Sequence, residues 1–216
     1  MAWYRCGGGG SESPKLNASA GYKATKDGMA ILESRYLCRI STQYDFYRPL
    51  TTEGNLPTYD GTKPFKMHLR AKATVRDTSI RSLMGSDTGN NYHLAGLLLW
   101  ATNDSSNDEL GFRYAISNNS WFKINVKKTQ VSVPANVWFT IDAGWDGTNA
   151  FLNYSDENGQ TYSTTSASAS SMYKESTDRM VIGNYGATDY PASGVIFDLF
   201  DCYWEENGVI LWGLKS

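Results

Sequence analysis

Residues 65–76 alternate between apolar and polar side chains over their whole length. The apolar positions are Phe65, Met67, Leu69, Ala71, Ala73 and Val75. The polar positions between them are Lys66, His68, Arg70, Lys72, Thr74 and Arg76. A period of two predicts a β-strand with one buried face and one face in water. Because the outward residues are mostly basic, we interpret that face as a solvated surface rather than a ligand site.

The rest of the chain repeats this pattern in short segments that are separated by polar turns. The predicted strands cover residues 36–40, 94–101, 110–116, 122–126, 137–143, 151–154, 160–165, 180–184, 195–205 and 209–214. The pairs Asp146-Gly147 and Asn207-Gly208 are typical of tight hairpins. No segment of useful length has a helical period. Many short strands with polar turns predict an all-β sandwich or barrel, which we assign to residues 30–216.

The inward positions of these strands define the expected hydrophobic core. They are Phe65, Met67, Leu69, Phe112, Ile124, Phe139, Ile141, Leu152, Ile182 and Phe200. Aromatic and branched side chains at such positions suit a half-buried pleated surface. We therefore expect these ten residues to be largely buried between two sheets.

Residues 1–29 differ from the rest because glycine and serine dominate their first part, with an unbroken run at Gly7–Gly10. Such a composition does not bury enough surface to offset the entropy of ordering, so we predict a flexible tail. Trp3 and Tyr4 lie at its start. Aromatic residues ahead of a flexible run indicate either an anchor that docks onto another subunit or an ordinary disordered tail.

The charge and the apolar runs exclude two classes of partner. The formal net charge is −2, and the longest basic run is Lys127-Lys128, so we expect no nucleic-acid binding. The longest apolar stretch, 94–101, has eight residues. A membrane helix needs about 20, so we expect no membrane insertion. The start of the sequence has no apolar signal core, so we expect any extracellular role to follow release by another route, such as lysis or particle assembly.

The cysteines and one acidic loop are the candidate metal ligands of the chain. Cys6, Cys38 and Cys202 match no zinc-binding spacing, and an odd number cannot pair completely within one chain. Asp104 and Asp108 share one loop and are oxygen ligands of the kind that calcium prefers. The same residues are equally ordinary in loops. We therefore predict no obligatory cofactor, with calcium at Asp104 and Asp108 as the option left open.

Three pieces of the second half resemble the laminin-G and concanavalin A-like lectin superfamily. The first runs from Trp138 to Tyr154 through the Asp-Gly hairpin, the second is 180–183, and the third runs from Gly194 to Leu211 through the Asn-Gly hairpin. The resemblance implies a two-sheet antiparallel jelly-roll sandwich whose first and last strands run side by side. It thereby places Cys38 and Cys202 on neighbouring strands, where we expect buried, reduced thiols.

The resemblance also bears on catalysis. Glycosidases of this fold carry a Glu-X-Asp-X-(X)-Glu pattern along one strand, and this chain lacks it. Asp198 and Asp201 are three residues apart, so an unbulged strand points them to opposite faces. We therefore predict that the protein is not an enzyme, and we keep a glycoside hydrolase as the less favoured alternative.

The first residues, Met-Ala-Trp-Tyr-Arg-Cys-Gly, resemble the start of tail-module proteins of phages and prophages. This resemblance implies a virion protein that is synthesised in a bacterial cytoplasm and is extracellular after release. We expect it to be a homo-oligomer that contacts other virion subunits through its N-terminal tail. The predicted function is a non-catalytic carbohydrate or host-cell-surface binding module with a cell-surface glycan as partner. A purely structural capsid or baseplate protein is the alternative.

A binding site on such a module is expected in the loops at one end of the sandwich. If the strands alternate in direction, the loops 86–92, 117–120 and 146–149 gather at that end. The candidate carbohydrate-binding residues there are Asn90, Tyr92, Asn118, Trp121 and Asp146. Each also has an ordinary explanation as a turn former or a packed aromatic residue.

Overall fold

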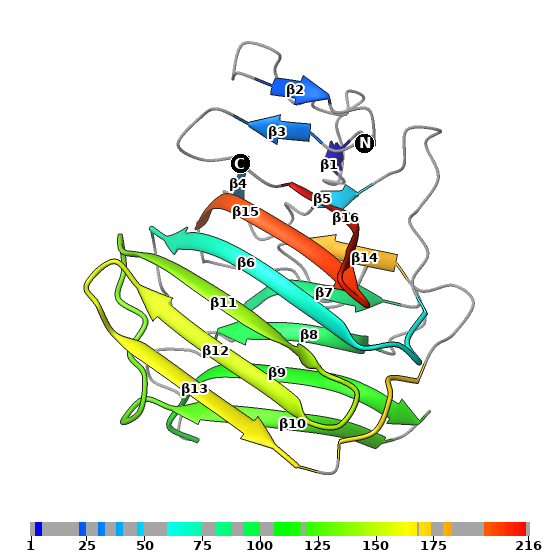
Figure 1. The fold of residues 1–216 in the computed structure, drawn as a ribbon. Helices are drawn as coiled ribbons and strands as arrows, with labels where there is room; N and C mark the ends of the chain where they lie inside the picture. The colour runs from blue at the N-terminus through cyan, green and yellow to red at the C-terminus, as the bar shows by residue number, and fades with distance from the viewer. Residues whose placement is uncertain are drawn as a thin grey trace.

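The computed structural model describes residues 3–5, 22–24, 30–32, 38–40, 47–49, 60–74, 81–87, 93–99, 106–117, 120–167, 169–173, 179–182 and 197–214. Within these ranges there is no helix, and the strands form two sheets that face each other (Figure 1). Among the described strands, every pairing is antiparallel except that of β16 with β3. The predicted all-β, two-sheet jelly-roll sandwich is confirmed.

The two sheets are named A and B. Sheet A has seven strands in the order β1 (Trp3–Arg5), β5 (Tyr47–Pro49), β14 (Arg179–Ile182), β7 (Arg81–Asp87), β8 (His93–Leu99), β9 (Asp108–Ser117) and β10 (Ser120–Lys127). Sheet B has nine strands. Eight follow the order β13 (Thr161–Ser166), β12 (Ala150–Asp156), β11 (Trp138–Trp145), β6 (Phe65–Ala73), β15 (Phe197–Glu206), β16 (Val209–Leu214), β3 (Ala30–Leu32) and β2 (Tyr22–Ala24). The ninth, β4 (Cys38–Ile40), pairs with β15.

The core lies between the inner faces of the two sheets. Along β6, inward residues are buried and the residues between them are partly or fully exposed, as the alternation predicted. The ring of Phe65 in sheet B meets the ring of Tyr114 in sheet A edge-on, with 5.4 Å between the ring centroids. It also stacks on the ring of Trp204, with 4.8 Å between the centroids. The predicted core residues that are confirmed as buried are Phe65, Met67, Leu69, Phe112, Ile124, Phe139, Ile141 and Leu152. The side chains of Ile182 and Phe200 lie outside the described part.

The strand β7 was missed in the sequence because its pattern does not alternate. Leu83 and Met84 are adjacent and both fully buried. A shift of register between Ser82 and Met84 accounts for this, since the extra residue of a bulge resets which face each side chain takes. A bulge of this kind leaves no simple period to find in the sequence.

The strand β15 has a second irregularity, between Leu199 and Asp201. Asp198 lies opposite Lys72 and Asp201 lies opposite Arg70, although they are three residues apart. Our assumption of an unbulged strand was therefore wrong. The bulge shifts the register between Asp198 and Asp201, so the expectation that they take opposite faces does not apply to this strand.

The expected neighbourhood of the cysteines is confirmed at the level of strands. β4 pairs with β15, but the residue opposite Cys38 is Leu199. Cys202 lies opposite Leu69 on β6, is fully buried, and is outside any disulfide. It packs in the core as a small apolar side chain.

The N-terminal residues contribute strands to both sheets. Trp3 lies opposite Pro49 where β1 pairs with β5 at one edge of sheet A. The remainder of residues 1–21 lies outside the described part, so the tail boundary at residue 29 stays a prediction. In the part of the chain that the structure describes, no helix is long and apolar enough to cross a membrane.

One end of the sandwich is closed by two short segments. Residues 169–173 bridge the sheets, since Trp145 of β11 donates its indole N–H to Ala169 O and Tyr114 of β9 donates its hydroxyl to Ser170 O. Residues 60–64 lie beside them, because Met172 N donates to Gly61 O at 2.9 Å. These segments hold the ends of β6, β11 and β15 in place.

Candidate active site

Strands β12, β11, β6 and β15 lie side by side in sheet B (Figure 1), and the residues that are in register across them form rows on its outer face. Residues that pair across neighbouring strands point to the same face, so their side chains stand side by side. The central row contains Asn153, Asp142, His68 and Tyr203 from β12, β11, β6 and β15. Because residues two apart share a face, the next row along lies about 6.6–6.8 Å away.

Two further rows flank the central one. On the hairpin side are Phe151, Gly144, Lys66 and Glu205. On the other side are Ser155, Thr140 and Arg70, with Asp201 in register opposite Arg70. The polar half of the alternation in β6 therefore places Lys66, His68 and Arg70 in three successive rows.

His68 and Asp142 form the pair at the centre of the face. The imidazole Nδ1 lies 2.8 Å from Asp142 Oδ1, and the two side chains are 15% and 32% exposed. An ionised carboxylate only accepts hydrogen bonds, so Nδ1 carries the proton and donates it to Asp142. In the neutral imidazole the lone pair is then on the other ring nitrogen, Nε2, which is the arrangement of a histidine that serves as a general base.

Tyr203 completes the central row. Its ring stacks on the His68 imidazole with centroids 4.4 Å apart and an interplanar angle of 12°. Burial raises the pKa of Tyr203, and the positive charge of Lys66 offsets part of that effect. The Lys66 ammonium lies 5.5 Å from the centre of the phenol ring. At neutral pH the phenol therefore keeps its proton and can act as a donor.

Lys66 is itself held by Glu205, with 3.0 Å between Nζ and Oε2. Burial acts to lower the pKa of Lys66, but the hydrogen bond to Glu205 and the nearby acidic groups outweigh it, so the pKa is raised. Lys66 is consequently a permanent cation beside the central row.

The far end of the face combines cations with an aromatic ring. Arg70 and Lys72 lie over the ring of Trp138, at 5.9 and 5.0 Å from its centre. An indole face attracts cations and offers a flat apolar surface. The described side chains of the outer face thus place basic groups on both sides of the His68–Asp142 pair.

Sequence reasoning missed this site because it treated the outward residues of β6 as a solvated face. His68 alternates with basic residues, and Asp142 and Tyr203 occupy polar positions on other predicted strands. Their encounter depends on which strands are neighbours and in which register, and the sequence does not show that.

The predicted loop site is only partly described. Asn90, Tyr92 and Asn118 lie outside the described residues. Trp121 lies on β10 and is 37% exposed. Asp146 lies in the β11–β12 turn, where its Oδ1 accepts hydrogen bonds from Asn149 N and Thr148 N. These two bonds lower the pKa of Asp146, and the bond from Asn149 has the larger effect. Trp121 belongs to sheet A and Asp146 to sheet B, and no contact between them is described.

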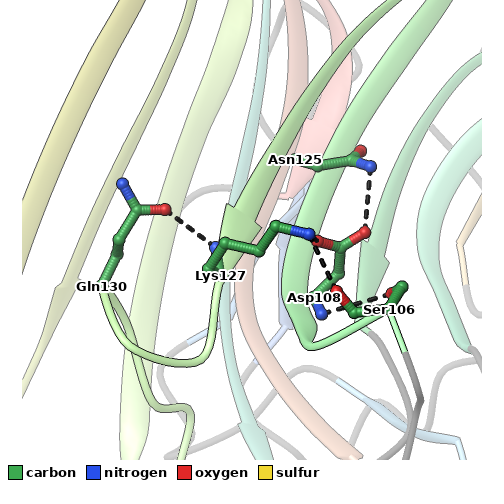
Figure 2. A network of polar contacts seen from close by, with 5 residues as sticks. All are labelled: Ser106, Asp108, Asn125, Lys127 and Gln130. Atoms are coloured by element: carbon green, nitrogen blue, oxygen red, sulfur yellow. Dashed lines mark hydrogen bonds and ion pairs between the residues drawn. The ribbon is translucent and has the colours of Figure 1, made fainter.

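Asp108 lies in a polar network at the start of β9 (Figure 2). Its carboxyl is buried and contacts Lys127 Nζ at 2.5 Å through Oδ1 and Asn125 Nδ2 at 3.0 Å through Oδ2. Lys127 also donates to Ser106 O at 2.8 Å. Asp104 lies outside the described residues. Within the described ranges no three metal-binding side chains cluster, and calcium at Asp104 and Asp108 stays a prediction.

The two residues of the predicted anchor lie in β1, and their role as an anchor stays a prediction. Trp3 and Tyr4 are part of the backbone of β1, and their side chains lie outside the described part.

No family model and no curated protein sequence matches the chain. The fold is similar to that of an alginate lyase from Klebsiella pneumoniae, with 10% identity, 95% of each chain covered and a TM-score of 0.52. Alginate lyase A1-II', a member of polysaccharide lyase family-7, gives 11% identity, coverage of 95% of this chain and 94% of that chain, and a TM-score of 0.49. Tailspike protein 2 of the Escherichia coli O157:H7 bacteriophage CAB120 gives 13% identity, 78% of this chain against 24% of that chain, and a TM-score of 0.50. At these identities the likeness shows a shared jelly-roll fold.

The similarity to the alginate lyase from Klebsiella pneumoniae overturns two of our predictions. The predictions of a non-catalytic binding or structural module, and of a protein that is not an enzyme, are wrong, because an alginate lyase shares this fold over 95% of both chains. The Glu-X-Asp-X-(X)-Glu pattern that the chain lacks is a signature of glycosidases, which hydrolyse the bond between sugars. That pattern carries no information about an enzyme that cleaves polysaccharides without hydrolysis.

Proposed function

We propose that the protein is a polysaccharide lyase that acts on polymers containing uronic acids, with its active site on the outer face of sheet B. The observation that carries the proposal is the central row, in which Asp142 holds His68 and His68 stacks on Tyr203. The fold shared with an alginate lyase is consistent with this chemistry.

Lyases break the bond between sugars by β-elimination. A base removes the proton from the carbon next to the sugar carboxylate, and the released electron pair forms a carbon–carbon double bond. The bond from the neighbouring carbon to the leaving oxygen breaks, and that oxygen takes up a proton. The reaction therefore needs one base, one acid and a cation that stabilises the charge developing on the carboxylate.

The outer face supplies all three groups. His68 acts as the base through Nε2, since Asp142 fixes the proton on Nδ1. Tyr203 acts as the acid, because its raised pKa keeps the phenol protonated. Arg70, two residues from His68 on the same strand, offers the planar pair of donors that matches a carboxylate.

A hydrolase is less well supported by the described side chains. Hydrolysis needs two carboxyls about 5–9.5 Å apart. Asp142 and Glu205 are the described carboxylates on this face, and they lie on β11 and β15 with β6 between them. Each also faces a basic partner, His68 or Lys66.

The test is the ultraviolet absorbance of the new double bond when purified protein is mixed with alginate, polygalacturonate, hyaluronan or chondroitin. We expect absorbance to rise with at least one polymer, and His68→Asn to lower the rate about 10²–10⁴-fold, the usual range for loss of a general base. Lys123→Ala, which removes an exposed cation from β10 of the other sheet, is the control. Absence of product with all four polymers, or an unimpaired His68→Asn variant, overturns the proposal.

We further propose that the enzyme is carried on a phage particle and reaches a cell-surface glycan there. The support is the N-terminal resemblance to tail-module proteins. Mass spectrometry of purified particles tests the location, and peptides of this chain found only in the soluble fraction contradict it.

A further inference from the structure

A hollow of about 250 Å³ lies beside the row of Lys66, at the hairpin end of sheet B. We call it the hairpin hollow, and its lining includes Pro64, Lys66, Asp146, Phe151, Glu205 and Asn207. Pockets for drug-sized ligands measure about 300–1,000 Å³, so this volume suits a single sugar ring. It adjoins the central row, about one row of side chains from His68.

The walls of the hollow are braced before any ligand arrives. Glu206, buried in the core, accepts a hydrogen bond from Asp60 N at 2.8 Å. Asn207 N donates to Pro64 O, also at 2.8 Å. Together these bonds tie the β15–β16 hairpin to the segment 60–64. A preorganised wall costs little to order on binding, which favours a real subsite.

Gly144 lets β11 approach β6 closely beside the hollow. It lies between Phe151 and Lys66 in the row, and no side chain rises between them. A Cβ atom at this position would lie 2.0 Å from Phe65 O, so only glycine fits where β11 approaches β6. Phe151 is partly exposed beside the gap and offers an aromatic ring to the apolar face of a sugar.

The charges of the hollow select against an acidic sugar. Lys66 and Glu205 neutralise each other at 3.0 Å. The pKa of Asp146 is lowered by hydrogen bonds from Asn149 N and Thr148 N, so its carboxylate is ionised at neutral pH. The lining is therefore net negative, and its carboxylates accept hydrogen bonds from sugar hydroxyls but repel a sugar carboxylate.

We propose that the hairpin hollow is a subsite for an uncharged sugar, next to the acidic sugar that is held over His68 and Arg70. This inference rests on the proposed lyase function. It specifies the substrate as a polysaccharide in which uronic acids are joined to neutral sugars, rather than a polymer of uronic acids alone. It also gives Asp146, a predicted carbohydrate-binding residue, a defined role in selecting that sugar.

The experiment measures binding by calorimetry, with the His68→Asn substitution introduced into the 216-residue chain. The probes are hexasaccharides of hyaluronan and chondroitin, which alternate acidic and neutral sugars, and hexasaccharides of alginate and polygalacturonate, which do not. We expect at least one mixed probe to bind more tightly than both of the probes that contain only uronic acids. Phe151→Ala should weaken the binding of that mixed probe about tenfold, which is the size of one aromatic contact. Asp146→Lys should reduce the difference in affinity between the mixed probes and the probes that contain only uronic acids. Ile116→Ala, an exposed apolar residue on sheet A, is the control and should change neither quantity.

The outcomes separate the subsite from the reaction. Three results overturn the subsite, even when the wild-type protein forms double bonds. The probes that contain only uronic acids bind as tightly as the mixed probes or more tightly, neither mixed probe binds, or Phe151→Ala leaves the affinity unchanged. Selective binding that Phe151→Ala weakens, without double-bond formation by the wild type, upholds the subsite as a binding site and refutes the lyase function.

Discussion

Replacing Asp142 by Asn tests the central pair without changing its shape. The carboxylate of Asp142 accepts the Nδ1 proton of His68 at 2.8 Å. An amide in the same position can instead donate to Nδ1, which moves the ring proton to Nε2 and removes the lone pair that acts as the base. The substitution is nearly isosteric, so the fold should be retained.

The size of the effect follows from the exposure of the pair. A hydrogen bond to a charged group contributes about 1.5–3 kcal/mol, and the 32% exposure of the Asp142 side chain moves its value toward the lower end. In addition, the wrong tautomer removes general-base catalysis, which alone contributes about 10²–10⁴-fold. We therefore expect kcat to fall about 10²–10³-fold, equivalent to about 3–4 kcal/mol of barrier.

The assay is the initial rate of double-bond formation, with kcat and KM measured separately. We expect the loss to lie in kcat with KM nearly unchanged, because Asp142 acts through His68 rather than on the sugar. Asn153→Asp, on the neighbouring strand of the same row, controls for the number of charges on the face. A variant with wild-type kcat, or one whose loss lies in KM alone, refutes the assigned role of Asp142.

Three further predictions concern stability. Phe65→Ala removes an aromatic ring that is 2% exposed and should cost about 3–5 kcal/mol in urea unfolding; a cost below about 1 kcal/mol contradicts the core assignment. Burial raises the pKa of Glu206, so its stabilising contribution is complete below the ordinary value of 4.5 and is lost as the pH rises through the raised value. Glu206→Gln keeps an acceptor for Asp60 N, and it should melt above the wild type at neutral pH but with it at low pH; equal melting at all pH values contradicts this. Lys127→Met leaves the carboxylate of Asp108 buried with only Asn125 beside it, and should cost about 1–3 kcal/mol, tested by thermal melting. An unchanged melting temperature shows that water replaces the lysine.

Local sequence determined the strands and the core of sheet B. The alternation in β6 and the Asp-Gly and Asn-Gly turns specify strand, face and hairpin from neighbouring residues alone. Gly147 and Gly208 have φ values of 103° and 79°, the left-handed conformations that such turns require. The strand β7 was not predicted, because its bulge interrupts the alternation of apolar and polar residues that identifies a strand in the sequence.

The candidate site was decided by tertiary structure. Asp142 and His68 are 74 residues apart in the chain and meet through the pairing of β11 with β6. His68 and Tyr203 meet through the pairing of β6 with β15, whose register includes a bulge. The order of strands in a sheet and their register depend on contacts between distant segments. The sequence by itself therefore determined which side chains face outward on each strand, whereas only the folded sheet decided which of them stand together as a base, an acid and a cation.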